Sequence, residues 1–345
     1  MIKMNFSYRT NRFNSAIINR PKSQQADVVF TVALTLAPLL AYLKQVEKFL
    51  WLIILACLWG SSYLFAKIGV TEIPPITFAM GRTALGASVL FLVLRFRGQR
   101  LPQWGGIWKH LALVALLHNA GPYILVAWAA QYIDSGFSAI IIGTTPLCTI
   151  LLAHFLVADD RLTPTKLAGT MVGLGGLVVL VAPTLLTGVQ ATGAGVLAML
   201  TVAVCYAIAI IYSRRHLRGL PALTAPTAQL MLATFYTLPL SLLIDQPLSL
   251  PMPSGLAISA WVGISVLGTA LAFMVFYRLV EIATPTHISM VNYLIPIVGA
   301  TLGVVVLGEQ LSWNIYLGFA VILTGVLIAN GIFTHYTRRG FVHSR

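Results

Sequence analysis

Apolar residues along this chain are gathered in long runs, and the short alternating or amphipathic patterns of a soluble domain are rare. Ten runs are each about as long as the ~20 residues that a helix needs to cross the hydrocarbon layer of a bilayer. The pattern therefore predicts ten membrane-spanning helices, at residues 50–69, 76–95, 110–131, 137–157, 167–185, 194–213, 227–244, 257–277, 287–307 and 313–333.

Positive charges alternate between the two ends of these helices. All but two of the 22 lysines and arginines lie before the first run, in every second connection or after the last run, and the exceptions are Lys67 and Arg82. The other connections, which lie near Glu72, Asp134, Gln190, Asp245 and Glu309, contain no lysine or arginine. Short loops rich in lysine and arginine remain cytoplasmic. The sequence thus predicts a multi-pass protein of the plasma (inner) membrane with both termini in the cytoplasm.

Composition supports a membrane protein. The 345 residues are 58% hydrophobic and only 9% charged, and the mean hydropathy is +0.87, whereas soluble domains carry about 25% charged residues. The net charge of +13 is explained by retention beside anionic headgroups, so no nucleic-acid partner is predicted. The three cysteines lie inside apolar runs without a histidine or second cysteine at metal spacing, so neither a metal, a cofactor nor a disulfide is predicted.

Residues 1–48 form a basic N-terminal extension in which an apolar stretch, 28–43, follows a polar one. An eleventh span is one interpretation, but the stretch is short and spanning would carry several cations outward. A signal peptide is a second, but no small-x-small cleavage site follows. The third is an interfacial helix, or a leader produced by an upstream start codon. We expect this third, non-spanning alternative.

The fourth and fifth runs resemble the ninth and tenth. Pro146, Asp160, Leu162, Gly169 and Gly176 recur in the same order and at nearly the same spacing as Pro296, Glu309, Leu311, Gly318 and Gly325. Because each unit has five spans, the second enters the membrane in the opposite orientation. The predicted fold is an all-α integral membrane protein of ten transmembrane helices in an inverted 5+5 repeat, with units at 49–185 and 193–333 and a cytoplasmic tail at 334–345. Monomer and homodimer both remain open.

Small and aromatic residues add packing and boundary signals. Gly169/Gly173 and Gly299/Gly303 lie on successive turns of one helix face, which predicts close helix packing. Tryptophans fall at predicted span ends, as headgroup anchors do, at positions Trp51, Trp104, Trp108, Trp261 and Trp313.

Four groups of short motifs stand in or beside the predicted spans. They are Trp59-Gly60-Ser61-Ser62-Tyr63 with Lys67, Pro74-Pro75 with Arg82, Thr144-Thr145-Pro146-Leu147 with Asp160-Arg161-Leu162-Thr163-Pro164, and Pro296 with Gly308-Glu309-Gln310-Leu311-Ser312. These motifs resemble those of EamA-type members of the drug/metabolite transporter superfamily. Asp159-Asp160 departs from the Gly-Glu that the first unit of the family usually has. The resemblance covers residues 49–333 and implies ten spans, cytoplasmic termini and export or exchange of small metabolites.

Charged and polar residues inside spans are candidates for substrate binding, because burying them in lipid is costly. Lys67 either attracts an anionic group or extends to the outer headgroups. Arg82 lies about 10 Å into the second span and either binds substrate or holds carbonyls at a helix end. His118 and Asn119 are at the middle of the third span, beside Pro122, which frees a backbone carbonyl. His118 also titrates near neutral pH, so protons are a candidate coupling ion.

Aromatic and amide side chains complete the predicted site for a small molecule. These further substrate-binding candidates are Trp59, Trp128, Gln131, Tyr206 and Asn292. Trp128 and Gln131 share a helix face at i, i+3. Pro122, Pro146 and Pro296 are expected to bend helices around the cavity.

The predicted function is secondary active transport: export or exchange of small metabolites, amino acids or drugs by alternating access. A membrane-embedded enzyme acting on lipid is one alternative, suggested by His154 and Asp159 at H-x4-D spacing, although on one helix these side chains diverge by about 140°. A passive channel is the other. No nucleotide-binding P-loop occurs in the sequence, so ATP is not hydrolysed by this chain, and an enzyme is not predicted.

Overall fold

Long apolar runs without water to bond their backbone groups must satisfy those groups internally, and the α-helix does so. The computed structural model describes residues 22–157, 162–186, 190–221 and 223–330, and within these ranges the regular structure is helical, without a strand. Among them are nine helices long and apolar enough to cross a membrane, together with a shorter apolar helix at Trp313–Ala329. The prediction of an all-α membrane protein with ten spanning helices is confirmed.

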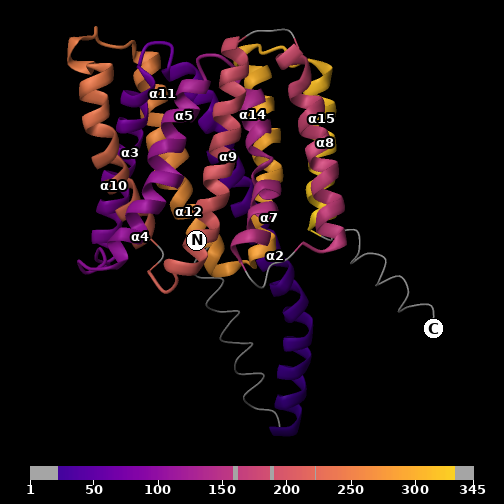
Figure 1. Ribbon diagram of the computed structural model, residues 1–345. Helices are drawn as coiled ribbons and strands as arrows, with labels where there is room; N and C mark the ends of the chain where they lie inside the picture. The colour runs from indigo at the N-terminus through magenta and orange to yellow at the C-terminus, as the bar shows by residue number, and fades with distance from the viewer. Residues whose placement is uncertain (1–21, 158–161, 187–189, 222, 331–345) are drawn as a thin grey trace, which may run out of the picture. The chain divides into compact units, whose positions relative to one another are not determined.

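Several spans are made of consecutive helical segments (Figure 1). The described elements are α2 Lys22–Gly69, α3 Pro75–Phe96, α4 Ile107–Val114, η1 Ala115–Ala120, α5 Gly121–Ala129, α6 Ser135–Ile142, α7 Thr145–Leu156, α8 Pro164–Leu186, α9 Gln190–His216, α10 Thr224–Leu240, η2 Ser241–Asp245, η3 Pro247–Ser249, α11 Gly255–Ser265, η4 Val266–Leu271, α12 Ala272–Ile282, α13 Pro285–Ser289, α14 Val291–Leu307 and α15 Trp313–Ala329.

The chain divides into two compact units, Met1–Trp51 and Leu52–Arg345. Helix α2 begins at Lys22 and is continuous into the first span, so no break separates the extension from the span that was predicted to start at residue 50. The reason is local: residues 44–50 contain no glycine or proline, and most of them favour helix. The stretch of α2 suited to spanning is Gln45–Gly69. A non-spanning role for residues 1–48 stays a prediction.

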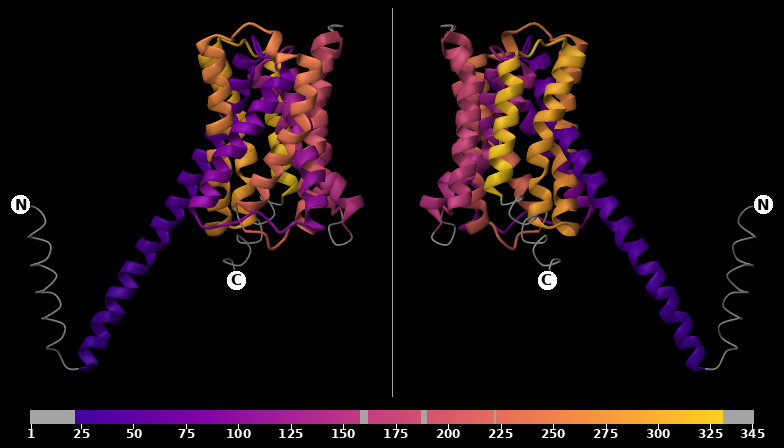
Figure 2. Two further views of the ribbon diagram at one scale, coloured as in Figure 1. Left: turned by 90° about the vertical axis from the view of Figure 1, so that its left-hand side faces the viewer. Right: turned by 90° about the vertical axis from the view of Figure 1, so that its right-hand side faces the viewer.

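The helices of the second unit stand side by side, and successive spans run in opposite directions (Figures 1 and 2). The connections at residues 70–74, 130–134, 246–254 and 308–312 therefore gather at one end of this unit, the upper end in Figure 1. The connections at residues 97–106 and 217–221, which carry arginines, lie at the opposite end.

Helices α8 and α15 pack backbone to backbone through glycines. A methyl group at Gly169 would lie 2.5 Å from the carbonyl oxygen of Gly325, and one at Gly176 would lie 2.8 Å from that of Gly318. Exchanging each glycine for its counterpart in the repeat converts the first contact into the second. This reciprocity is what a pseudo-two-fold axis between inverted units requires, and it confirms the close packing expected from Gly169 and Gly173.

Gly299 and Gly303 also permit close packing, in this case against α6. A methyl group at Gly299 would meet the side chain of Ala139, and one at Gly303 would lie 2.9 Å from the hydroxyl of Ser135. The predicted close approach at this second glycine pair is therefore present.

The third and eighth spans, which are counterparts in the two units, are each interrupted by a π-helical segment, η1 and η4. In the third span Pro122 lacks an N–H group, and the N–H of Gly121 bonds the carbonyl of Leu116 five residues earlier. The fourth span is interrupted at residues 143–144, just before Pro146, whereas Pro296 lies inside the continuous helix α14. Such π segments are frequent at functional sites.

Trp261 is not a headgroup anchor, contrary to the sequence-based expectation. Its indole N–H donates to the carbonyl of Phe78 at 2.9 Å, and its ring packs directly on Gly81 of α3. Because Gly81 has no side chain, α3 leaves room for the Trp261 ring at this position. Gly81 is 180 residues away in sequence, so nothing in the residues around Trp261 indicates this contact. Trp104 and Trp313 are 85% and 72% exposed, as anchors are.

Candidate substrate-binding site

Arg82 is the most buried charged residue among the described residues, with 7% of its surface exposed. Helix α3 carries it seven residues inward from its first residue, Pro75. Its Nε donates to the hydroxyl of Thr269 in η4 at 2.9 Å, and its guanidinium carbon lies 3.7 Å from the centre of the Tyr123 ring. A cation over an aromatic face is stabilised by the ring quadrupole, more strongly when water is excluded.

Two polar side chains of η1 lie beside this arginine. Asn119 is fully buried, and its amide nitrogen donates to the Tyr123 hydroxyl at 3.3 Å. The Asn119 Oδ1 atom and the His118 Nδ1 atom are both buried without a hydrogen-bond partner. Most buried polar atoms in proteins are satisfied, so unpartnered ones in the middle of a span point to a missing ligand.

Aromatic rings from both halves complete what we call the central polar cluster: Arg82, His118, Asn119, Tyr123, Tyr206 and Thr269. The ring of His118 lies 5.0 Å from that of Tyr206 in α9, centre to centre. The charge of Arg82 also acts on Tyr63, His118 and Tyr206 across the cluster. Since α9 and η4 belong to the second half, the cluster lies at the interface of the two halves.

The other sequence-predicted residues lie elsewhere. Trp59 packs against Phe276 with 5.6 Å between ring centres. Trp128 packs beside Tyr132, with 4.8 Å between ring centres, and against the main apolar core. Asn292 is half-buried near the start of α14.

Gln131 and Lys67 are not brought to the central polar cluster. Gln131 lies beyond the last residue of α5, exposed in a turn, so the shared helix face with Trp128 does not extend to it. Lys67 donates to the carbonyl of Ile133 at 2.8 Å in the connection between the third and fourth spans. The sequence showed the helix periodicity but not that α5 ends at Ala129.

Sequence reasoning missed Tyr123 and Thr269 as members of the site. Tyr123 stands four residues after Asn119, so helix periodicity was a usable signal for it. Thr269 is 187 residues from its partner Arg82, and no local pattern distinguishes it from other threonines in the spans.

Three carboxylates at the upper end of the bundle each bond the start of a helix in the other half; we call these contacts the carboxylate clasps. Glu72 accepts the N–H and hydroxyl of Ser254, both at 2.6 Å. Asp245 accepts the N–H of Thr77 at 2.6 Å and its hydroxyl at 2.9 Å. Glu309 accepts the N–H groups of Ser135 at 2.7 Å and Gly136 at 2.9 Å. Anions are stabilised at helix N-termini, where N–H groups lack helical partners.

The Glu309 clasp adjoins a second acid and a cation. Asp134 precedes α6 but makes no capping bond to it, because Glu309 occupies the first two N–H groups. Burial raises the pKa of Asp134, the charge of Glu309 raises it further, and Lys67 opposes both effects. The positive charge of Lys67 therefore acts on the acidic groups at this end of the bundle.

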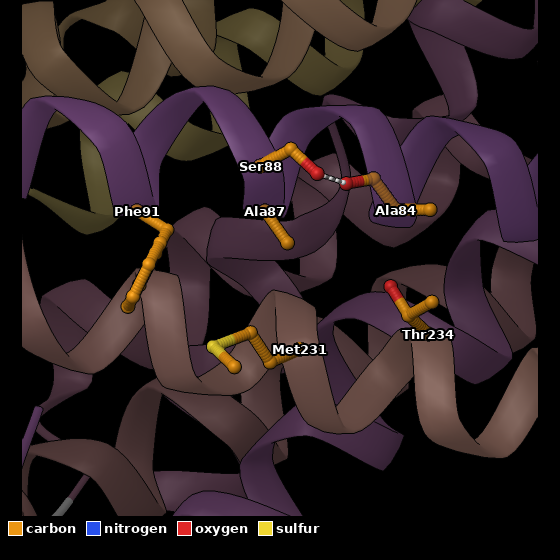
Figure 3. Close-up of a pocket in the computed structure, with 6 residues that line it drawn as sticks. All are labelled: Ala84, Ala87, Ser88, Phe91, Met231 and Thr234. Atoms are coloured by element: carbon orange, nitrogen blue, oxygen red, sulfur yellow. Dashed lines mark hydrogen bonds between the residues drawn. The ribbon is translucent and has the colours of Figure 1, made fainter.

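A groove of about 310 Å³ lies between α3 and α10, lined by Ala84, Ala87, Ser88, Phe91, Met231 and Thr234 (Figure 3). Ser88 and Thr234, its two hydroxyl residues, each bond a carbonyl of their own helix at 2.8 Å. The groove thus has no free polar group for orienting a polar solute. Among the described residues there is also no group of three or more His, Cys, Asp or Glu that could hold a metal ion.

The EamA-like transporter family matches residues 47–182 and again residues 193–331. The chain belongs to this family. EamA-like membership makes it a multi-pass membrane transporter, while the division into five-helix units at 49–185 and 193–333 stays a prediction.

Two of three curated relatives carry transporter names, and none of the three names states a substrate. The chain is 24% identical over 286 residues to the uncharacterized transporter YoaV of Bacillus subtilis, covering 82% of this chain and 97% of that protein. It is 26% identical to the uncharacterized inner membrane transporter YedA of Escherichia coli (strain K12), covering 79% and 86%. Protein PecM of Dickeya dadantii is 25% identical, covering 80% and 90%.

A solved crystal structure has a similar fold. It superposes with a TM-score of 0.57 at 22% identity, over 82% of this chain and 96% of that chain. At this identity the similarity concerns the fold alone.

Proposed function

We propose that this EamA-like protein is a secondary active transporter that exports or exchanges small metabolites, amino acids or drugs by alternating access. The observation that carries the proposal is the central polar cluster, because its residues come from both inverted halves and meet deep within the bundle. Such transporters bind substrate between their halves near the middle of the membrane. Trp59, Trp128 and Asn292 are proposed to line the path to the cluster.

The carboxylate clasps support a closed state at one end. Every clasp joins a residue of one half to a helix start of the other, so the halves cannot separate there without breaking charge-assisted hydrogen bonds. Rocking of the halves about the central site would require these bonds to open and re-form. The clasps are thus suited to act as a reversible gate.

The distribution of positive charge supports one orientation of the protein. The connections at residues 97–106 and 217–221, which carry arginines, lie at the end opposite the clasps, and short cationic loops remain in the cytoplasm. We therefore propose that the clasped end is external and that both termini are cytoplasmic. The gate would then separate the central polar cluster from the outside.

A proton gradient or a counter-substrate gradient is the proposed driving force. Among the described residues the cluster contains no carboxylate, and its one imidazole, His118, belongs to the side-chain type that most often carries protons near neutral pH. Proton coupling through His118 predicts that a His118→Gln variant keeps counterflow but loses acceleration by a pH gradient.

Counterflow in proteoliposomes tests the function. Vesicles containing the full-length protein are loaded with a metabolite panel and then exposed to a trace of labelled solute. A carrier accumulates the label transiently, because the loaded solute occupies the returning site. Uptake that neither saturates nor shows counterflow would identify a channel, and turnover of added lipid that requires His154 and Asp159 would identify an enzyme.

A further inference from the structure

Arg82 carries a buried positive charge without a protein counter-ion. None of the described residues places a carboxylate within ion-pair distance of it, and the ion pair between Arg278 and Glu281 is exposed at the end of the eighth span. A charge inside a membrane span is costly unless it is paired, and charges there usually mark a ligand path. Tyr123 and Thr269 relieve part of this cost but supply no negative charge.

The guanidinium keeps most of its hydrogen-bonding capacity free. Its Nε atom is bonded to Thr269, while its two terminal amino groups donate to no described residue. These amino groups form the planar fork that binds carboxylate and phosphate oxygens with two parallel bonds. Asn119, whose amide nitrogen donates to the hydroxyl of the same Tyr123 ring that lies under Arg82, offers a buried acceptor without a partner, its Oδ1 atom.

From this donor and acceptor set we infer that the transported substrate is a small organic anion. Its carboxylate or phosphate group pairs with Arg82, and a hydroxyl or amino group on the same molecule donates to Oδ1 of Asn119. The rings of Tyr123 and Tyr206, which belong to the same cluster, contact its apolar part. This inference rests on the proposed transport function and specifies the class of substrate.

The negative charge inferred for the substrate follows from the absence of acidic side chains among the described residues of the cluster. A cationic substrate would be repelled by Arg82 and would meet no carboxylate among the described residues of the cluster. A neutral substrate would leave the arginine charge uncompensated. An anion removes both problems and gains charge-assisted bonds, which are stronger than neutral ones.

Binding to the purified full-length protein in detergent tests the charge preference directly. The probes are 3-phenyllactate, phenyl phosphate and the neutral isostere 3-phenyllactamide, measured by isothermal titration calorimetry. We expect the better of the two anions to bind at least about tenfold more tightly than the amide, the difference that one charge-assisted hydrogen bond supplies. Which anion binds better distinguishes carboxylate from phosphate recognition. Equal affinity for the amide and both anions would overturn the inference.

Three variants assign the preference to Arg82. Arg82→Gln should remove the anion preference, and Arg82→Lys should keep a weaker one, because lysine retains the charge but not the fork. Arg95→Gln, at the exposed end of the same helix, is the matched control and should bind as wild type does. If Arg82→Gln does not fold, the anion preference of Arg82→Lys, compared with that of the wild type, still tests the role of the guanidinium. An unchanged anion preference in Arg82→Gln or in Arg82→Lys, relative to wild type, would refute the role of the guanidinium.

Counterflow separates this inference from the proposed function. Counterflow of neutral or cationic solutes, together with none for either anion, would overturn the anionic substrate and leave the transporter intact. Absence of counterflow for every solute, in a protein that binds the anions as expected, would overturn transport and leave the anion site.

Discussion

Substituting Glu309 by glutamine should weaken the external gate. The two carboxylate oxygens each accept one N–H from the first turn of α6, at 2.7 and 2.9 Å. Glutamine keeps one oxygen acceptor and turns an NH₂ group toward the other donor, so one charge-assisted bond is lost. Such a bond contributes about 1.5–3 kcal/mol, and the partial exposure of Glu309 favours the lower end. The closed state should therefore lose stability by about tenfold relative to open states.

Thiol labelling measures this shift. Ser138 lies one turn deeper in α6, is 3% exposed, and has a hydroxyl without a partner, so Ser138→Cys is a mild reporter of opening. The natural cysteines Cys57, Cys148 and Cys205 are first replaced by alanine. A membrane-impermeant maleimide added from outside should then label position 138 about ten times faster in the Glu309→Gln background when opening precedes labelling.

The matched control is Glu281→Gln. Glu281 pairs with Arg278 at 3.2 Å on the exposed surface at the other end, where a single ion pair is worth at most about 1 kcal/mol. This variant should label at the wild-type rate. Equal labelling in the Glu309→Gln and wild-type backgrounds would refute the argument that the clasp holds the closed state.

Three further predictions follow from other contacts. The hydrogen bonds from Ser254 lower the pKa of Glu72, so the Glu72 clasp is intact above the ordinary glutamate value of 4.5 and is lost as pH falls through the lowered pKa. External labelling should therefore rise at acid pH, and the Glu72→Gln variant should not show that rise. Gly325→Ala should lower the free energy of unfolding by about 1–3 kcal/mol, because the added methyl group forces helix α15 away from α8. Gly175→Ala, whose methyl group would meet open space, should leave it unchanged, and thermal unfolding in detergent measures both variants. Lys67→Gln should alter external labelling but leave the substrate KM unchanged, because its contact is to the Ile133 carbonyl; a raised KM would place Lys67 in the site.

Features that depend on neighbouring positions could be predicted from the sequence. The apolar run length gave the spans, and the placement of lysine and arginine gave the alternation of the connections. The four-residue spacing of Gly169/Gly173 and of Gly299/Gly303 predicted faces for close packing, because residues four apart lie on successive turns of one helix. Pro122 predicted that the helical hydrogen bonding is interrupted near His118. It did not predict that the interruption is a π-helical segment.

Features that depend on which helices meet required the tertiary structure. Arg82 was a candidate from its depth alone, but its contacts with Tyr123 and Thr269 join residues that are 41 and 187 positions away. Glu309 was recognised as a repeat acid in a connection, while its role at the start of α6 depends on a partner 174 positions away. Sequence spacing fixes which side chains share a helix face. The choice between substrate binding and packing for each side chain is fixed only when the helices are packed against one another.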